Sequence, residues 1–151
     1  MTSRNLTIRS IAATDEADWR RLWSGYLEYY ESSVLEDVYA STFKRLLSDD
    51  IGEPSGLLAL VNGRPVGLVH YIFHRHCWKI ENTCYLQDLF TDPDHRGSGV
   101  ARQLIEAVYD AADNAGCPSV YWMTQEFNYR GRMLYDKVGQ KTPFIKYSRV
   151  T

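Results

Sequence analysis

The segment PDHRGSGVA, residues 93–101, constrains the fold most, because it is a polar, glycine-bearing turn between two apolar segments. The preceding YLQDLF is typical of a strand, and the following VARQLIEAVYDAADNAG carries its apolar residues on one helical face. A helix N-terminus exposes N–H groups without intrahelical acceptors and favours negative charge. Gly97 and Gly99 lack the Cβ atoms that would hold a phosphate away, while Ser98 adds a hydroxyl and Arg96 a positive charge. The junction therefore predicts an anion site.

Three other interpretations of this loop are available from its residues. A P-loop requires Gly-Lys-Ser/Thr after its spacing, which is absent. A dinucleotide-binding loop would need a third glycine or alanine where Arg102 stands, and it would normally follow the first strand of its unit. A flexible turn with no ligand is the simplest alternative, and the loop alone does not exclude it.

Length and composition limit the classes of protein. A chain of 151 residues corresponds to one domain, 1–151. The net charge of −2 gives no general attraction to nucleic acid. No apolar run approaches the roughly 18 residues that span a bilayer, and the first twenty residues are too polar for a signal peptide. Three cysteines without a Cys-x-x-Cys pair favour reduced thiols over a disulfide framework or zinc site. We expect a cytoplasmic protein with no metal, no nucleic-acid partner and no membrane partner.

Helical and strand patterns alternate along the chain. Thr14 or Asp15 is expected to cap a first helix, whose apolar face runs from Trp19 to Tyr30. Asn-Gly at 62–63 is typical of a tight hairpin turn. Further helices are expected at 40–50, 100–115 and 128–139, and strands at 6–10, 56–62, 65–73, 79–90, 119–124 and 144–149. This order predicts an α/β (α+β mixed) fold, a mixed sheet with helices on both faces.

Two motifs together resemble the GCN5-related N-acetyltransferase (GNAT) superfamily. The first is YLQDLFTDPDHRGSGVARQLI, in which Arg96, Gly99 and Ala101 match the pattern Arg/Gln-x-x-Gly-x-Gly/Ala after a strand that ends in Asp-Pro. The second is SVYWMTQEFNYRGRMLYDKVG, with Asn128, a small residue at Gly131 and Tyr135 seven residues after the asparagine. The two motifs cover about residues 85–139. WRRLWSGYLEYYE and LYDKVG are similar to the yeast histone, polyamine and D-amino-acid subgroup, and YLQDLF resembles the diamine acetyltransferases.

The resemblance implies a GNAT fold, with a mostly antiparallel sheet of about six to seven strands. It also implies acetyl-CoA as cosubstrate. The N–H groups of the loop would bind its pyrophosphate, and backbone groups of Leu89, Phe90 and Thr91 would align the pantetheine arm as an added strand. The expected cofactor-binding residues are therefore Leu89, Phe90, Thr91, Arg96, Gly97, Ser98, Gly99, Val100, Ala101, Asn128 and Tyr135.

Tyr135 is the expected general acid. A thiol has a pKa near 8.5 and a phenol one near 10, so a positioned phenol can protonate the leaving thiolate. The sequence leaves open which group acts as the general base that deprotonates the acceptor amine. Relatives often use a glutamate on the strand before the loop, but here that position corresponds to Gln87, which accepts no proton. Asp88 follows it, so the base is Asp88, a water relay, or none if the neutral amine is captured. Asp88 as a purely structural partner is an equal alternative.

The acceptor side is expected to come from the first helices. Glu28, Tyr29 and Glu31 are the expected substrate-binding residues, with Glu36 and Asp37 nearby, because acidic groups attract a cationic amine or basic peptide. A solvated helix face explains each of them equally well. His70, His74 and His76 alternate on one strand face, for which we expect a half-exposed face or a substrate wall and not a metal site.

The sequence thus predicts an N-acetyltransferase that transfers the acetyl group of acetyl-CoA to a primary amine by direct attack in a ternary complex. The acceptor would be a small-molecule amine or polyamine, an amino acid or a protein lysine. Likeness to the subgroup also implies a homodimer. The alternative, motivated by Gln87, is a non-catalytic acyl-CoA-binding or interaction module on the same fold.

Overall fold

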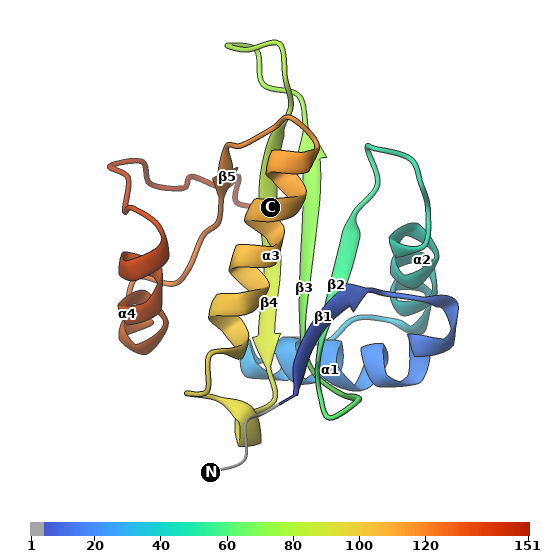
Figure 1. Ribbon diagram of the computed structural model, residues 1–151. Coiled ribbons are helices and arrows are strands. Elements are labelled where there is room, and N and C mark those ends of the chain that lie inside the picture. Colours follow the sequence, from blue (N-terminus) through green and yellow to red (C-terminus); the bar gives the residue numbers. More distant parts are fainter. Residues whose placement is uncertain (1–4) are drawn as a thin grey trace.

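The computed structural model describes residues 5–151 (Figure 1). Its strands are β1 (Leu6–Ser10), β2 (Ser55–Val61), β3 (Arg64–His74), β4 (Thr83–Thr91) and β5 (Val120–Tyr121). Its α-helices are α1 (Glu16–Tyr29), α2 (Glu36–Leu46), α3 (Val100–Asn114) and α4 (Tyr129–Val138). Two short 3-10 turns, η1 (Ala13–Asp15) and η2 (Pro93–His95), precede α1 and the loop before α3.

The sheet has the order β1-β2-β3-β4-β5. The pairs from β1 to β4 are antiparallel, and β5 joins β4 in parallel. In the β2–β3 turn Asn62 and Gly63 both have positive φ, 51° and 81°, as the expected tight hairpin requires. The mixed, mostly antiparallel α/β sheet is confirmed. Residues 5–151 contain five strands, fewer than the expected six or seven.

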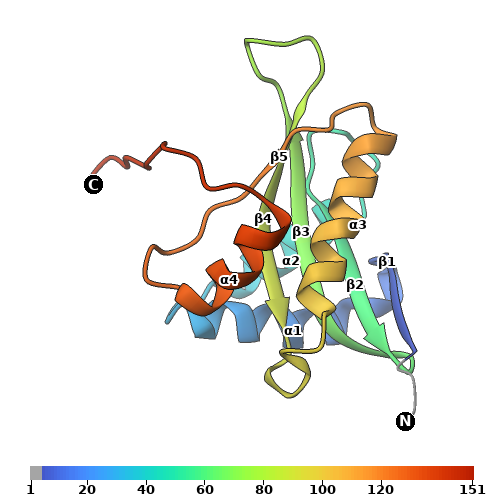
Figure 2. The ribbon, with the colours of Figure 1, turned by 60° about the vertical axis from the view of Figure 1, so that its left-hand side comes forward.

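Each face of the sheet has its own apolar core, as the alternation of side chains along a strand requires. Leu57 and Ala59 of β2 pack on the face that α3 covers, whereas Leu58 and Leu60 pack on the face that α1 and α2 cover. Figures 1 and 2 show these helices on opposite faces of the sheet. The expected arrangement of helices on both faces of the sheet is confirmed.

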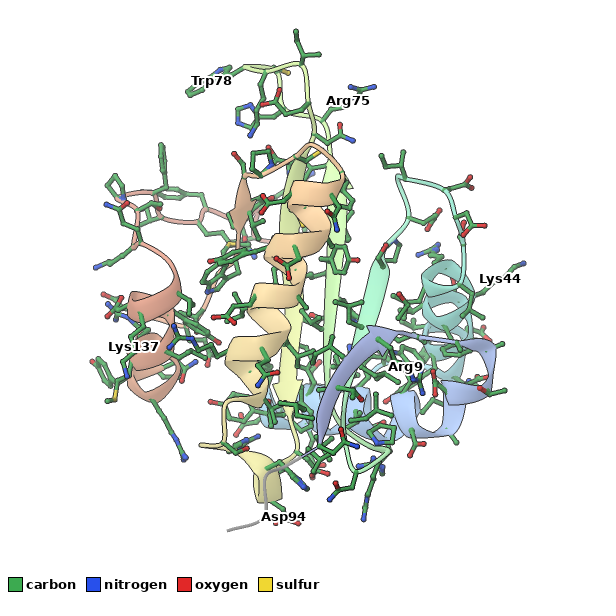
Figure 3. All side chains as sticks on the ribbon, in the orientation of Figure 1. Arg9, Lys44, Arg75, Trp78, Asp94 and Lys137 are labelled. Atoms are coloured by element: carbon green, nitrogen blue, oxygen red, sulfur yellow. The ribbon has the colours of Figure 1, made fainter. Side chains whose placement is uncertain are left out.

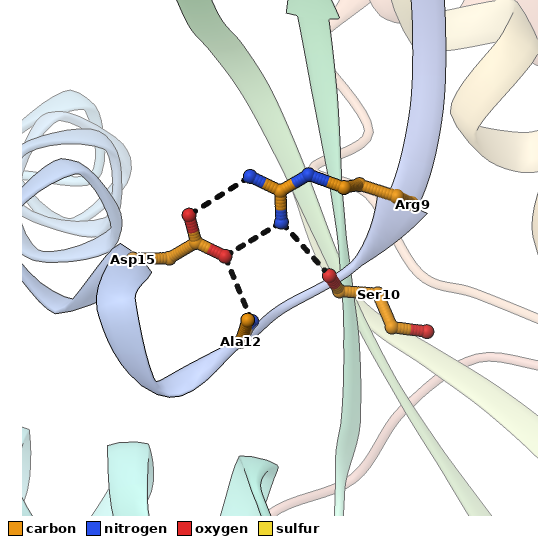
Figure 4. A network of polar contacts seen from close by, with 4 residues as sticks. All are labelled: Arg9, Ser10, Ala12 and Asp15. Atoms are coloured by element: carbon orange, nitrogen blue, oxygen red, sulfur yellow. Dashed lines mark hydrogen bonds and ion pairs between the residues drawn. The ribbon is translucent and has the colours of Figure 1, made fainter.

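A polar corner fixes the entry to α1 (Figure 4). The Asp15 carboxylate accepts hydrogen bonds from the Arg9 guanidinium at 2.7 and 3.0 Å and from the Ala12 N–H at 2.7 Å. The Arg9 guanidinium beside Asp15 holds the pKa of that carboxyl below its usual value. Asp15 immediately precedes α1, as expected, but its side chain ties the helix to β1 and does not cap α1.

Within residues 5–151 one expected strand is absent, another is shorter than expected, and one helix boundary was wrong. Of residues 119–124 only Val120–Tyr121 pairs, because the chain leaves β4 after Tyr121. Residues 144–149 form no strand, since these residues run away from the body and have no neighbour to pair with (Figure 2). The second helix starts at Glu36, not at 40. The acidic residues of its first turn and the basic residues of its last turn match the helix dipole, a signal that the sequence already contained.

Candidate active site

Strand β4 is paired along its whole length on one side and hardly at all on the other. Its pairing with β3 runs from Thr83 to Thr91. Its pairing with β5 comprises only Cys84 with Val120 and Tyr85 with Tyr121. From Leu86 onward the second edge of β4 has no strand neighbour among the described residues. Its backbone groups are therefore available to an extended ligand.

A β-bulge at Gln87 sets which way the following side chains point. His70 of β3 lies opposite Asp88, but the next residue, Tyr71, lies opposite Leu86, so Gln87 has no partner of its own. An extra residue reverses the alternation of everything after it. Leu86 accordingly packs on the α3 face, whereas Phe90 packs on the α1 face. The bulge also directs Asp88 toward α1.

The loop between β4 and α3 offers an unfilled set of N–H groups. Gly97 and Gly99 have φ values of 76° and 86°, and an added Cβ would meet nothing within 4 Å at either position. The first backbone bond of the helix is from the Gln103 N–H to the Gly99 carbonyl, at 3.0 Å. The N–H groups of residues 97–102 have no backbone acceptor within residues 5–151. An anion with several acceptor oxygens, such as a diphosphate, fits such a turn.

Two side chains of the loop, Ser98 and Arg96, donate hydrogen bonds to backbone carbonyls of the same segment. The Ser98 hydroxyl donates to the His95 carbonyl. The Arg96 guanidinium donates to the Thr91 carbonyl at 3.1 Å and lies over the rings of Tyr29 and Phe90. The Arg96 side chain thus holds the loop against the end of β4 and against α1. Figure 3 shows Asp94 of this loop at the opposite end of the molecule from Trp78, which marks the β3–β4 hairpin.

Helix α4 is positioned by specific contacts. The Asn128 side chain accepts from the Gly131 N–H at 3.2 Å and donates to Thr124 at 2.9 Å, so the expected cap is confirmed. A Cβ at Gly131 would lie 2.5 Å from the Asn128 amide, which explains the small residue there. At the other end, a Cβ on Gly139 would lie 2.7 Å from the Trp122 ring. Close packing at both ends therefore fixes the helix that carries Tyr135.

The site is completed by an aromatic cavity at the open edge of β4. Tyr135 packs edge-on against Trp122, with 5.8 Å between ring centroids. Burial, and then the nearby Tyr30 and Tyr29, raise the pKa of Tyr135 to about 12. Its phenol is therefore protonated throughout the physiological range. The cavity brings together α1, β4, α3 and α4 and is lined by Tyr26, Tyr30, Leu86, Gln87, Leu89, Ile105, Trp122, Met123 and Tyr135.

A second, more open cavity lies between α1 and β4, with about 770 Å³ of empty space. Glu28 and Tyr29, two of the expected substrate residues, line it. Arg21 and Arg96 line it as well, so it carries both signs of charge. Glu31 is exposed just after α1, and Glu36 is paired with Arg20 at 2.8 Å.

The three alternating histidines do not form the expected half-exposed face. His70 is only 3% exposed and is hydrogen-bonded to Trp19 and Asp88. His74 ends β3 and contacts the Tyr121 hydroxyl, and His76 lies beyond the strand. Within the part of the chain that the structure describes, no three His, Cys, Asp or Glu side chains gather as metal ligands. No helix there is both long and apolar enough to cross a membrane.

Comparisons with known proteins show the family of the chain. The acetyltransferase (GNAT) family profile matches residues 18–140. The chain is 34% identical over 151 residues to a D-amino-acid N-acetyltransferase of Saccharomyces cerevisiae, covering 99% of this chain and 93% of the relative. It is 32% identical over 128 residues to a thialysine N-epsilon-acetyltransferase of Bos taurus, covering 82% and 71%.

A solved structure shares the fold. Aminoglycoside acetyltransferase AAC(6')-Iy, in complex with a bisubstrate analog of CoA and acetylneamine, matches with a TM-score of 0.82 and 20% identity, covering 97% of this chain and 99% of that chain. The family profile spans most of the chain, and the yeast relative spans nearly all of it. The resemblance seen in the sequence motifs is confirmed: the chain belongs to the acetyltransferase (GNAT) family and is an N-acetyltransferase.

Proposed function

We propose that this N-acetyltransferase transfers the acetyl group of acetyl-CoA directly to the primary amine of a small molecule, with both substrates bound together. The open edge of β4, which ends at a loop of unfilled N–H groups, is the observation that carries the proposal. An extended pantetheine arm could follow the edge, and the diphosphate could lie on residues 96–101. Leu89, Phe90 and Thr91 are the proposed arm-binding residues.

The two ends of the cofactor would meet different parts of the chain. Gly97, Ser98, Gly99, Val100 and Ala101 would bind the diphosphate through their N–H groups. The Thr91 carbonyl already accepts from Arg96, so Leu89 and Phe90 are left as the main partners of the arm. Arg96 supports the loop and adds positive charge near the phosphates. Asn128 holds the start of α4 and would contact the cofactor from that side.

The proposed chemistry is nucleophilic attack of a neutral amine on the thioester carbonyl. A backbone N–H of β4 near the bulge, that of Leu89, would stabilise the oxygen of the carbonyl as it becomes negative, and such donors contribute about 3 kcal/mol. Tyr135 would protonate the departing sulfur, since its phenol lines the cavity and carries its proton. Gln87 also lines the cavity but can offer the amine only hydrogen bonds.

For the acceptor we propose a small cationic or zwitterionic amine. The relatives are named for D-amino acids and thialysine, both small primary amines. Glu28 and Tyr29 line the cavity between α1 and β4 and would attract an ammonium group. Glu31 is exposed just after α1, the helix that carries both residues. Arg96 of the same cavity would favour an acceptor that also carries a carboxylate, whereas Arg21 is already paired with Asp92.

An acceptor panel tests the proposal. Purified protein, acetyl-CoA and a thiol-reactive dye report CoA release with D-amino acids, L-amino acids, thialysine, polyamines, an aminoglycoside and a lysine peptide. We expect turnover with at least one small amine, and the largest kcat/KM among the amino acids. CoA binding without turnover on any of them would support the non-catalytic module instead.

We further propose a cytoplasmic homodimer. After α4 the chain carries four large apolar side chains that are each more than three-quarters exposed: Phe144, Ile145, Tyr147 and Val150. Such a tail is typical of a segment that pairs with a second copy. Light scattering should give a dimer for the full chain and a monomer for residues 1–141.

The free thiols Cys77, Cys84 and Cys117 support a reducing compartment.

A further inference from the structure

A buried polar chain runs from α1 through β3 to β4, next to the cavity of Tyr135. His70 and Asp88 are 3% and 8% exposed and lie opposite each other in the sheet. His70 Nδ1 lies 2.8 Å from Asp88 Oδ2. Trp19 Nε1 donates to His70 Nε2 at 2.9 Å, and Trp23 Nε1 donates to Asp88 Oδ2 at 3.3 Å. Neither the proposed cofactor contacts nor the acid role of Tyr135 uses these groups.

The two tryptophans determine where the histidine proton lies. An indole N–H only donates, so His70 Nε2 must accept from Trp19. The ring proton of a neutral His70 is therefore on Nδ1, from which it is donated to Asp88. A proton on Nε2 would point at the Trp19 N–H, which is itself a donor. Asp88 Oδ2 accepts from both His70 and Trp23, which leaves Oδ1 as the oxygen for an incoming proton.

Tyr26 connects Asp88 to the cavity. It lies one turn of α1 after Trp23, which donates to Asp88. Its side chain lines the cavity of Tyr135 together with Gln87 and Leu89, the residues on either side of Asp88 in β4. Burial raises the pKa of the Tyr26 phenol, and the nearby charge of Asp88 raises this pKa further. The other groups whose pKa values Asp88 raises are also phenols, Tyr30 of α1 and Tyr85 of β4. Asp88 is thus the acidic side chain that these three phenols share.

We propose that Asp88 takes up the proton that the acceptor ammonium loses, relayed by the Tyr26 hydroxyl, and that His70 is the residue that positions Asp88 for this step. The inference rests on the proposed function. An N–H bond of the ammonium breaks and its proton bonds to the Tyr26 oxygen, while the proton of Tyr26 passes to Asp88 Oδ1. Tyr26 ends neutral as it began, the ammonium and carboxylate charges cancel, and a neutral amine remains to attack the thioester.

Four variants of the full chain test the relay, assayed with the fastest acceptor of the panel. Asp88→Asn and Tyr26→Phe should each lower kcat/KM about 10²-fold or more at pH 7, the usual contribution of a general base. The deficit should shrink toward pH 10, because an amine with a pKa near 10.4 then loses its proton to water. His70→Leu should give a smaller deficit with the same pH dependence. His70→Asn should restore activity, since its amide N–H can replace Nδ1–H toward Asp88.

Matched measurements separate this role from a structural one. His76→Leu, at a histidine outside the chain of contacts, should leave kcat/KM unchanged. Nitrogen-15 NMR should place the ring proton of neutral His70 on Nδ1, from which it is donated to Asp88. Three results would overturn the relay while leaving the proposed acetyltransferase function standing. These are losses of kcat/KM that are equal at every pH, a wild-type kcat/KM in Tyr26→Phe, and a His70 ring that carries its proton on Nε2. Absence of turnover by the wild type would overturn the proposed function and the relay together.

Discussion

The two faces of the sheet provide their parts of the site in different ways. Toward α3, the loop of residues 96–101 offers backbone N–H groups beside two glycines with positive φ. Toward α1, the polar groups are buried side chains, His70 and Asp88, each fixed by a tryptophan. A backbone site depends on φ and on the absence of Cβ atoms, so it tolerates most side-chain changes. A buried side-chain site depends on every donor and acceptor and tolerates few.

Tyr135 lines the cavity at the open edge of β4, and its substitution should lower kcat more than the other substitutions do. Tyr135→Phe removes the proposed proton donor but keeps the ring packed on Trp122, so kcat should fall about 10²-fold or more while the Kd for CoA stays nearly constant. Since the pKa of Tyr135 is raised to about 12, its acid form is present below that pH and lost above it. The wild type should therefore show no loss of kcat from this group between pH 8 and 10.

Tyr129→Phe is the control for this prediction, because Tyr129 begins the same helix and is largely exposed. It should retain wild-type kcat. If Tyr135→Phe also retained wild-type kcat, Tyr135 would be a packing residue and the proton would have to reach sulfur from another donor.

Gly99→Ala tests the backbone site and should have the next largest effect. Its φ of 86° is unfavourable for alanine, so unfolding should become easier by about 1–2 kcal/mol. The new Cβ would also hold a phosphate away from the N–H groups. Loss of one charge-assisted hydrogen bond is worth about 1.5–3 kcal/mol, or about a tenfold to hundredfold increase in the Kd for CoA. Isothermal titration calorimetry measures the affinity and thermal unfolding the stability.

Gly63→Ala is a close control. Gly63 has a similar φ of 81° in the β2–β3 turn, and a Cβ there also meets nothing within 4 Å. Both variants should lose similar stability, but only Gly99→Ala should lose CoA affinity. Equal affinities would place the cofactor away from this loop.

The contrast between the faces also explains which features the sequence could predict. The glycine turn before α3 and the Asn128 cap were predictable, because glycine, asparagine and helix-start signals act within a few residues. The Gln87 bulge has no such local signal, and it turns Asp88 toward α1. The donors that hold His70 and Asp88 lie 51 and 65 residues away in sequence, so alternation alone suggested a half-exposed histidine face.

The ends of the sheet were overpredicted for a related reason. The β-branched and aromatic residues at 119–124 and 144–149 fit a strand, but propensity requires a neighbour with free backbone groups. The chain after Tyr121 leaves β4, and this opening is the feature that the proposed cofactor requires. The structure therefore departs from the local pattern where the site lies.

Glu28→Gln should have the smallest effect, a change in the KM for the acceptor amine, and it tests the acceptor-binding part of the proposed site. Glu28 is exposed at the rim of a cavity, where one charge contributes about 0.2–1 kcal/mol, so the KM for a polyamine should rise about 1.4- to 5-fold with kcat unchanged. Glu81→Gln, in the β3–β4 loop, should leave KM unaltered, and added salt should shrink the difference. A zwitterionic amino acid should respond less, because Glu28 repels its carboxylate while attracting its ammonium. Equal responses to both acceptors would mean that Glu28 does not sense acceptor charge.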